Sequence, residues 1–324
     1  MRRRSIVIAG LAALLVALER PLAQSPEKTP RVGILSPADS DKTAIFDAFR
    51  QRLHELGYVE GRNIILEFRL ARGDYSRLPQ LAAELAALPV DVILSDTSPG
   101  VTAEASRHIP IVNATMVDPV EEGFASSLSR PGANITGFSL MHGDLSAKRL
   151  ELLHTAFPHV SAVAVLVQPS SPLMKRFLEE TQAAARSMSL SIVARVAADT
   201  PYALRALTPA AISGAGAMVV LPTGMFWNHR REIVPLVNAA RVPAIYSERE
   251  YADDGGLMAY GANVPDNFRR AAGYIDRILK GAKAGDLPIQ QPVKFDFVIN
   301  LKTAKALGLA IPQTILARAD EVIE

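Results

Sequence analysis

The chain has 324 residues, 49% of them hydrophobic, and this length and content favour a globular protein of two domains over a disordered chain. The net charge of +2 comes from Lys and Arg spread along the sequence without a long basic block, so nucleic-acid binding has little support. The absence of cysteine excludes disulfide frameworks, thiolate metal sites, cysteine nucleophiles and a lipid anchor of the bacterial lipoprotein type.

The first 23 residues have the layout of a secretory signal peptide. Three arginines precede an apolar run, Ile6–Leu18, that is too short to span a bilayer comfortably, and small residues follow up to Ala23. We therefore expect export to the periplasm, cleavage after Ala23 and no lipid anchor. An uncleaved membrane anchor is the alternative, because Pro21 stands where a small residue favours cleavage. The choice between the Sec and twin-arginine routes stays open.

Strands and helices alternate in the first half of the chain. Apolar residues at helical spacing from Ile45 to Leu56 indicate the first helix, and Ser76 is expected to cap the second. The order of elements predicts a doubly wound parallel sheet. The predicted strands are Arg31–Leu35, Asn63–Arg69, Asp91–Ser95 and Ile109–Ala114.

The second half repeats this order. Ser171 and Thr200 are expected to cap two of its helices, and a further helix is predicted over Asn228–Ala240. Polar loops again follow the carboxyl ends of the strands, so the pattern predicts a second doubly wound lobe. The predicted strands are Ala162–Val167, Leu190–Val196, Ala217–Leu221 and Val242–Tyr246.

The tail adds one strand and one helix to each half. A helix over Asp266–Ala282 is expected to return to the first lobe, and a last helix, capped by Asn300 and ended by Gly308, to complete the second. The fold class is therefore α/β, with two lobes joined by a three-strand hinge that can open and close. The expected hinge strands are Ile135–Ser139, Leu257–Gly261 and Val293–Ile299. The expected lobes are 31–137 with 262–290, and 138–261 with 291–324.

No motif for enzyme chemistry is present. The chain lacks GxSxG, a Walker loop and HExxH, and the glycines Gly214 and Gly216 stand before a strand, where a dinucleotide loop does not occur. The six histidines are scattered, and we expect them at the surface or at helix ends, without a metal. No cofactor is expected. A triad of residues distant in the sequence is not excluded by pattern, so a hydrolase that uses a cleft carboxylate remains an open alternative.

A binding cleft is the stronger prediction, because ligands of open α/β sheets bind beyond the carboxyl ends of the strands. Hydroxyls and helix-start amides there suit a carboxylate, and Asp118 or Glu248 suits an ammonium group. The alternative for the serines is plain helix capping, for Asp118 a turn, and for most of the acidic run from Glu248 to Asp254 an exposed surface. The candidates from these loops are Ser36, Thr97, Ser98, Thr115, Met116, Asp118, Pro169, Ser171, Thr223 and Glu248.

Aromatic residues are few, at 6% of the chain, yet several lie near the predicted cleft loops, among them Phe226, Tyr246 and Tyr251. Trp227 follows the Thr223 loop and could form a wall against which a planar ligand stacks, or could cover its own lobe. Tyr260 stands at a predicted crossing between the lobes, where it could contact a ligand or pack within the hinge. Both are candidate binding residues.

Three separated runs carry a family resemblance: DPVEEGFASSLSRPGANITGFS, YSEREYADDGGLMAYGANV and PVKFDFVINLKTAKALGL. They resemble the periplasmic substrate-binding proteins of ABC importers, in the subgroup related to tryptophan and tyrosine receptors, over nearly all of Arg31–Ile323. The resemblance implies the type I periplasmic-binding-protein fold, a small-molecule ligand with aromatic amino acids favoured, and an ABC permease as partner. We expect a monomer. A periplasmic sensor with the same fold is the second hypothesis.

Overall fold

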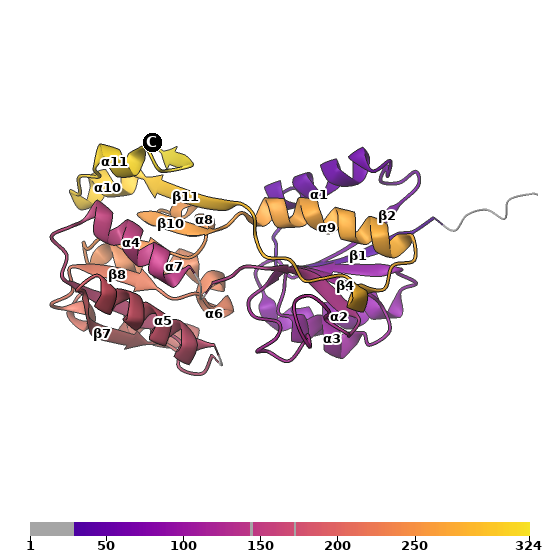
Figure 1. Ribbon diagram of the computed structural model, residues 1–324, viewed down its shortest axis with the longest axis horizontal. Helices are drawn as coiled ribbons and strands as arrows, with labels where there is room; N and C mark the ends of the chain where they lie inside the picture. The colour runs from indigo at the N-terminus through magenta and orange to yellow at the C-terminus, as the bar shows by residue number, and fades with distance from the viewer. Residues whose placement is uncertain (1–28, 143–144, 172) are drawn as a thin grey trace, which may run out of the picture.

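Two lobes lie side by side in the computed structural model (Figure 1), which describes residues 29–142, 145–171 and 173–324. The predicted signal peptide, residues 1–23, lies outside the described residues. Within those described ranges, no helix is long and apolar enough to cross a membrane.

The N-terminal lobe is built on a five-stranded sheet in the order β2-β1-β3-β4-β5, with every pair parallel. This order is one of the two common doubly wound arrangements, with its switch point between β1 and β3. Its strands are β1 (Arg31–Ser36), β2 (Ile65–Leu70), β3 (Val92–Ser95), β4 (Ile111–Met116) and β5 (Ile135–Ser139).

Helices cover both faces of this sheet, because successive side chains of each strand point to opposite faces and both faces are apolar. Val32 and Ile34 face the helix pair α1 and α9, whereas Leu35 faces α2. The helix α9 comes from far along the chain and packs along α1 (Figure 1). The helices are α1 (Ala44–Glu55), α2 (Leu78–Ala87), α3 (Pro99–Ala105) and α9 (Val264–Leu279), with short 3-10 turns η1 (Tyr75–Arg77) and η4 (Ala284–Asp286).

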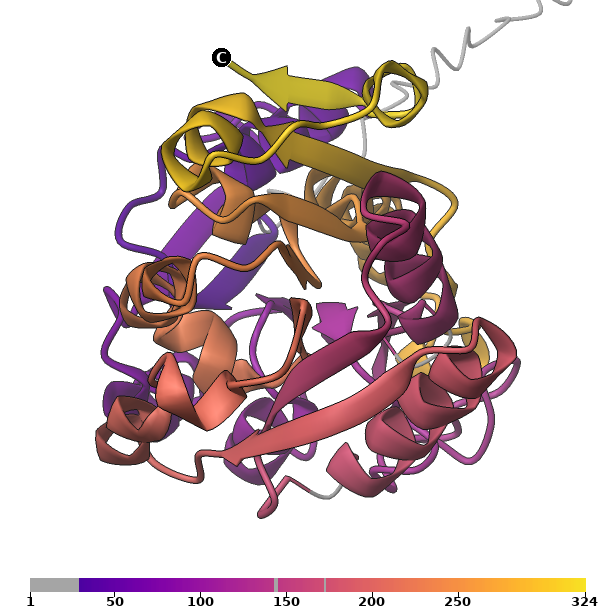
Figure 2. The same cartoon turned by 90° about the vertical axis from the view of Figure 1, so that its left-hand side faces the viewer.

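The C-terminal lobe has a seven-stranded sheet in the order β12-β11-β10-β9-β8-β6-β7. The part from β7 to β10 repeats the order of the first lobe, so the predicted two-lobed doubly wound architecture is confirmed. The last strands lie along one edge of this sheet, where the chain ends (Figure 2). Its strands are β6 (Ala162–Val167), β7 (Ser191–Ala197), β8 (Ala217–Val220), β9 (Ala244–Tyr246), β10 (Met258–Ala262), β11 (Phe295–Asn300) and β12 (Glu321–Ile323).

One strand pair departs from the parallel arrangement. β10 and β11 pair antiparallel, from Met258 with Ile299 to Ala262 with Phe295. The reason is the route of the chain: β10 leads toward the N-terminal lobe and β11 returns from it, so the two strands run in opposite directions.

Several helix ends test the predicted capping residues. Thr200 and Asn300 accept the expected backbone hydrogen bonds, and Gly308 ends α10 with a φ of 71°. Ser76 and Ser171 do not cap: Asp74 accepts the hydrogen bond at η1, and α5 starts later, after Leu173. The helix predicted over Asn228–Ala240 is α7, which begins at Arg230 after the separate one-turn helix α6. The helices of this lobe are α4 (Ser146–Ala156), α5 (Met174–Ser187), α6 (Gly224–Asn228), α7 (Arg230–Ala239), α8 (Arg249–Asp253), α10 (Leu301–Leu307) and α11 (Gln313–Leu316), with 3-10 turns η2 (Pro201–Ala206) and η3 (Ala210–Ile212).

The chain passes between the lobes three times: from β5 to α4, from β10 to α9 and from η4 to β11. The strands expected to form the hinge belong mainly to the lobe sheets, and the connections are the short segments beside them. The third connection pairs with both others, because Ser139 N–H donates to Gln290 O at 2.9 Å and Asn263 N–H donates to Lys294 O at 3.0 Å. The three connections therefore lie side by side.

At Gly137 in β5, beside the first connection, the backbone of the neighbouring strand β4 lies too close for a side chain. Its φ is 142°, and a Cβ there would lie 1.8 Å from Asn113 O in β4. Gly137→Ala should lower the free energy of unfolding by about 2 to 4 kcal/mol, because backbone atoms cannot move aside cheaply.

The control is Gly273→Ala in the middle of α9, where nothing lies within 4 Å of the added Cβ. Alanine there should stabilise by about 0.5 to 1 kcal/mol through helix propensity. Urea denaturation of both variants measures the contrast, and equal effects would contradict this packing.

Candidate ligand-binding cleft

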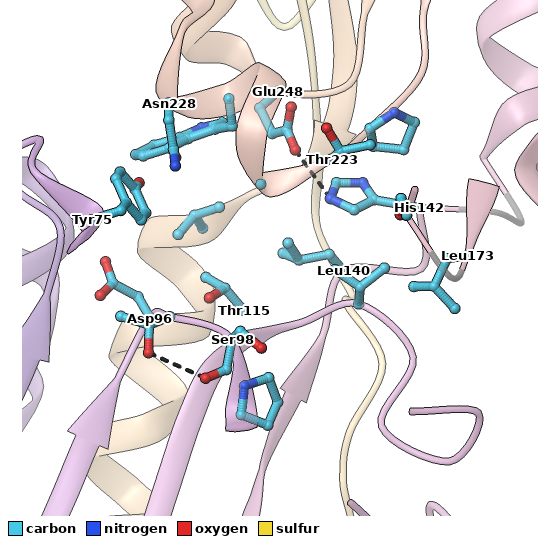
Figure 3. Close-up of a pocket in the computed structure, with 18 of the residues that line it drawn as sticks. Tyr75, Asp96, Ser98, Thr115, Leu140, His142, Leu173, Thr223, Asn228 and Glu248 are labelled. Carbon is cyan, nitrogen blue, oxygen red and sulfur yellow. Dashed lines mark hydrogen bonds and ion pairs between the residues drawn. The ribbon is translucent and has the colours of Figure 1, made fainter. Parts of the chain in front are cut away.

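A cavity of about 350 Å³ lies between the lobes. Its walls are the loops that follow β1, β3 and β4 in one lobe and β6, β8 and β9 in the other. Figure 3 shows Tyr75, Asp96 and Thr115 on the N-terminal side, facing Asn228 and Glu248 of the C-terminal lobe. The cavity therefore occupies the switch points of both sheets, where this topology places ligands.

The structure brings a group of the predicted site residues to this cavity. Each lies at or after the carboxyl end of a strand, where the topological rule places ligand contacts. The residues that line it are Thr97, Ser98, Thr115, Ser171, Thr223, Trp227 and Glu248.

Five other candidates lie elsewhere. Ser36 is buried behind the cavity, where its hydroxyl donates to Asp96 Oδ2 at 2.9 Å. Met116 packs in a small apolar cluster beneath the loop, and Pro169 is exposed on a turn. Tyr260 stacks on Phe295 inside its own lobe, with ring centroids 6.0 Å apart. Asp118 lies in a separate, neighbouring cavity.

Asp118 forms an ion pair with Arg176, which comes from α5 of the opposite lobe. The same guanidinium lies 2.6 Å from Glu121, so two carboxylates of the N-terminal lobe hold one cation of the C-terminal lobe. Burial acts to raise the pKa of Asp118, but backbone N–H groups and Arg176 outweigh it, and the pKa is lowered. Asp118 is thus an interlobe contact in this structure.

A capped turn positions the aromatic wall. Thr223 Oγ1 accepts the N–H of Phe226 at 3.1 Å and starts α6, a helix of one turn. Phe226 is fully buried and fixes this turn, so Trp227 and Asn228 are directed to the cavity. The guanidinium of Arg230 lies 4.5 Å from the Trp227 ring centroid and supports it.

Asn113 fixes the opposite wall. Its side-chain amide donates to Thr97 O at 2.8 Å, and its Oδ1 accepts the N–H of Thr115 at 2.9 Å. Through these two bonds Asn113, which is fully buried in β4, holds the residues after β3 against the carboxyl end of β4. The two threonines therefore have fixed positions at the cavity wall.

A buried charged group borders the cavity at the first connection. His142 Nε2 lies 3.0 Å from Glu248 Oε1, and Ser247 donates its hydroxyl to the same carboxylate. Arg149, also buried, donates to His142 O and to Tyr260 O, both at 2.9 Å. Burial acts to raise the pKa of Glu248, but His142, Ser247 and Arg149 together lower it. Glu248 is thus an ionised group with partners of its own.

Three further carboxyls of the cavity behave in the opposite way. Burial raises the pKa of Asp96, Glu122 and Glu250 to about 7 in each case. The neighbouring acids Asp118 and Glu121 contribute to the shift of Glu122. At neutral pH these groups are therefore poised between the neutral and the ionised form.

Sequence reasoning missed these carboxyls together with Tyr75, His142 and Asn228. Asp96 directly follows β3, so the rule that found Thr97 could have found it. The expectation that the histidines lie at the surface or at helix ends is wrong for His142, which is buried in the first connection. Within the described residues, no group of three or more potential ligands could hold a metal ion.

Two doubly wound lobes with a cleft between their switch points define a binding protein of the type I periplasmic class. Residues 31–323 match the family model described as ABC transporter substrate binding protein, and the chain belongs to this family. The predicted membership is confirmed.

Relatives of known structure or function agree with this membership. A tyrosine-binding protein of Clostridioides difficile is 27% identical over 265 residues, which cover 81% of this chain and 75% of the relative. A conserved domain protein of Vibrio cholerae is 25% identical with a TM-score of 0.78, and a Streptococcus pneumoniae ABC domain in complex with L-Trp is 24% identical with a TM-score of 0.80. Both structural matches cover 91% of this chain and 100% of the other.

The raised pKa values predict how stability depends on pH. A carboxyl that keeps its proton up to about pH 7 when folded, but only to about pH 4 when unfolded, makes the unfolded state bind fewer protons between these values. Its contribution to the free energy of unfolding therefore falls as pH rises through this window, by at most about 1.4 kcal/mol per pH unit. Asp96→Asn should remove this loss.

Urea denaturation between about pH 5 and pH 8 measures the difference between Asp96→Asn and the unmodified protein, which should grow with pH in favour of the variant. Ser36 and Tyr75 are the polar neighbours of Asp96 and stay unchanged. Glu179→Gln, which removes an exposed carboxyl on α5, is the control and should give a parallel curve. Parallel curves for both variants would contradict a raised pKa of Asp96.

Proposed function

We propose that this protein is the periplasmic solute-binding component of an ABC importer. The chain is exported with removal of residues 1–23, carries no lipid anchor and acts as a monomer. It captures one small molecule between its lobes and presents the closed form to a permease in the inner membrane. The observation that carries this proposal is a cavity whose walls come equally from two lobes joined by a hinge. The family membership supports it.

The walls favour a solute with an amino group and an aromatic or other apolar body. Trp227 and Phe177 offer apolar faces, and several carboxyls offer acceptors for N–H groups. The relatives point the same way, since one is named for tyrosine and another is in complex with L-Trp. Aromatic amino acids and their amine derivatives are therefore the first class to screen.

Closure is the mechanism. The bodies that move are the expected lobes, 31–137 with 262–290 and 138–261 with 291–324, about the connections at their boundaries. A ligand that contacts both lobes favours the closed form, because its contacts to the two walls exist together only there. Arg176 contributes in the same direction, since its ion pairs with Asp118 and Glu121 join the lobes.

A thermal-shift screen of the purified protein against aromatic amino acids, amines and related metabolites tests the proposal. A solute at a hundred times its dissociation constant should add about 2.7 kcal/mol of stability. Small-angle scattering should show a smaller radius of gyration with that solute than without it. Binding without closure would overturn the proposed mechanism, and chemical conversion of the solute would favour the hydrolase alternative.

Trp227 should report directly on occupancy, because it is the only tryptophan of the chain. A bound ring that packs on it should change its emission, and Trp227→Leu should weaken binding about tenfold through loss of that contact. Tyr202→Leu is the control, because this ring is 75% exposed and lies outside the cavity. If the Trp227 variant keeps the original affinity, the indole is not a wall of the binding site.

The interlobe ion pair of Arg176 and Asp118 should change ligand affinity without contacting the ligand. Arg176→Gln should raise the dissociation constant about two- to fivefold, since a partly exposed pair contributes about 0.5 to 1 kcal/mol to the closed form. Arg186→Gln, an exposed arginine at the end of the same helix, is the control and should have no effect. Titrations at low and high salt measure both, and the difference should shrink at high salt. A difference that salt leaves unchanged would contradict an electrostatic origin.

A further inference from the structure

Acidic side chains outnumber basic ones in the described lining of the cavity. Four carboxyls line the described walls: Asp96 and Glu122 from the N-terminal lobe, and Glu248 and Glu250 from the C-terminal lobe. No Lys or Arg is among the described lining residues, and His142 is the only basic side chain there. His142 is already engaged by Glu248. Arg230 is close enough to oppose the rise in the pKa of Glu250, but it pairs with Asp254 and is not among the lining residues. The other three carboxyls therefore have no basic partner among the described lining residues.

These three carboxyls also have unused hydrogen-bonding capacity. Asp96 Oδ1, Glu122 Oε2 and Glu250 Oε2 are buried and have no hydrogen-bond partner among the described residues, whereas both oxygens of Glu248 are bonded. A buried acceptor without a partner costs about 1 to 3 kcal/mol, so native structures satisfy such atoms with a protein group, water or a ligand. N–H donors on the ligand would satisfy these acceptors.

The polar and apolar side chains are unevenly distributed along the cavity. In Figure 3, Tyr75, Asp96 and Asn228 gather at one end, and Leu140 and Leu173 lie at the opposite end beside the paired His142 and Glu248. Phe177 also contributes to the apolar lining. A ligand with a charged head near Asp96 and an apolar body against Leu140, Leu173 and Phe177 fits these walls.

We infer that the ligand is an amphipathic cation: an aromatic or similarly apolar body with a protonated amine and without a carboxylate. This inference rests on the proposed solute-binding function and narrows its ligand class. A carboxylate beside the amine would find the hydroxyls of Thr97 and Thr115, but it would face carboxyls that are partly or fully ionised, with no arginine or lysine among the described lining residues to pair with it. The amine alone can donate to the acceptor oxygens of these carboxyls without that repulsion.

Three probes with the same ring and two-carbon chain separate charge from shape. Phenethylamine is a cation, phenylalanine a zwitterion and 3-phenylpropionate an anion. Isothermal titration calorimetry of the purified protein near neutral pH should give the tightest binding for phenethylamine, about tenfold or more tighter than for phenylalanine. The anion should bind most weakly. A phenylalanine affinity equal to or above that of phenethylamine, or no binding of phenethylamine, would overturn the inference.

Variants of the carboxyls give a second arm. Asp96→Asn and Glu250→Gln keep the shape of the side chain and replace an acceptor oxygen with a donor, so each should weaken phenethylamine about tenfold. The same variants should leave 3-phenylpropionate unchanged or strengthen it. Glu179→Gln removes an exposed carboxyl of α5 outside the cavity and is the matched control. Equal loss for cation and anion would assign these carboxyls to folding and overturn their role in charge selection.

The outcomes also distinguish this inference from the proposed function. If a zwitterion or an anion binds and closes the lobes while phenethylamine does not bind, the charge inference fails and the solute-binding function stands. If no solute of any charge binds or closes the lobes, the proposed function fails as well.

Discussion

A buried guanidinium is the interaction on which the two-lobed structure most depends. Arg149 joins the backbone of the first connection, at His142, to β10 just before the second, at Tyr260. Burial lowers the pKa of Arg149 to about 10, and the nearby Glu248 opposes that change. Because a buried charge without a partner is costly, this cluster holds both connections in one arrangement. The cavity wall that carries Glu248 is thereby fixed relative to the hinge.

The cavity combines rigid supports with unsatisfied groups. Asn113 and the Thr223 cap hold the loops in place through bonds that are complete without a ligand. Asp96 and Glu250, in contrast, present oxygens that no group of the described chain satisfies. Their stability cost is tolerated where the fold is otherwise well packed, which is typical of functional sites. We propose that ligand specificity resides in these groups, which the fold positions but leaves without a hydrogen-bond partner.

The sequence predicted what local chemistry and topology determine. Element order and the Asn300 and Thr200 caps follow from residues that are neighbours in the chain, and the strand-end rule located Thr97 and Trp227 near one cavity. Prediction from the sequence failed where a property depends on contacts between segments that are distant in the chain. Asp118 pairs with Arg176 across the lobes, His142 is buried by a connection, and Glu250 lies in an acidic run that looks exposed. Neither spacing nor composition records such contacts.

The helix α9 belongs to the N-terminal lobe but comes late in the sequence, so this lobe is completed late in synthesis. Phe268 packs edge-on against Phe46, with centroids 5.6 Å apart, and Ala272 and Ile275 fill the same apolar cluster. One face of the first sheet therefore has only α1 as cover until residues near 279 have been synthesised, after the main strands of the second lobe. Domains usually fold in the order in which the ribosome releases them. Here the lobe that is synthesised first is completed late, and the nascent chain would expose the hydrophobic surface that α9 covers for most of its synthesis.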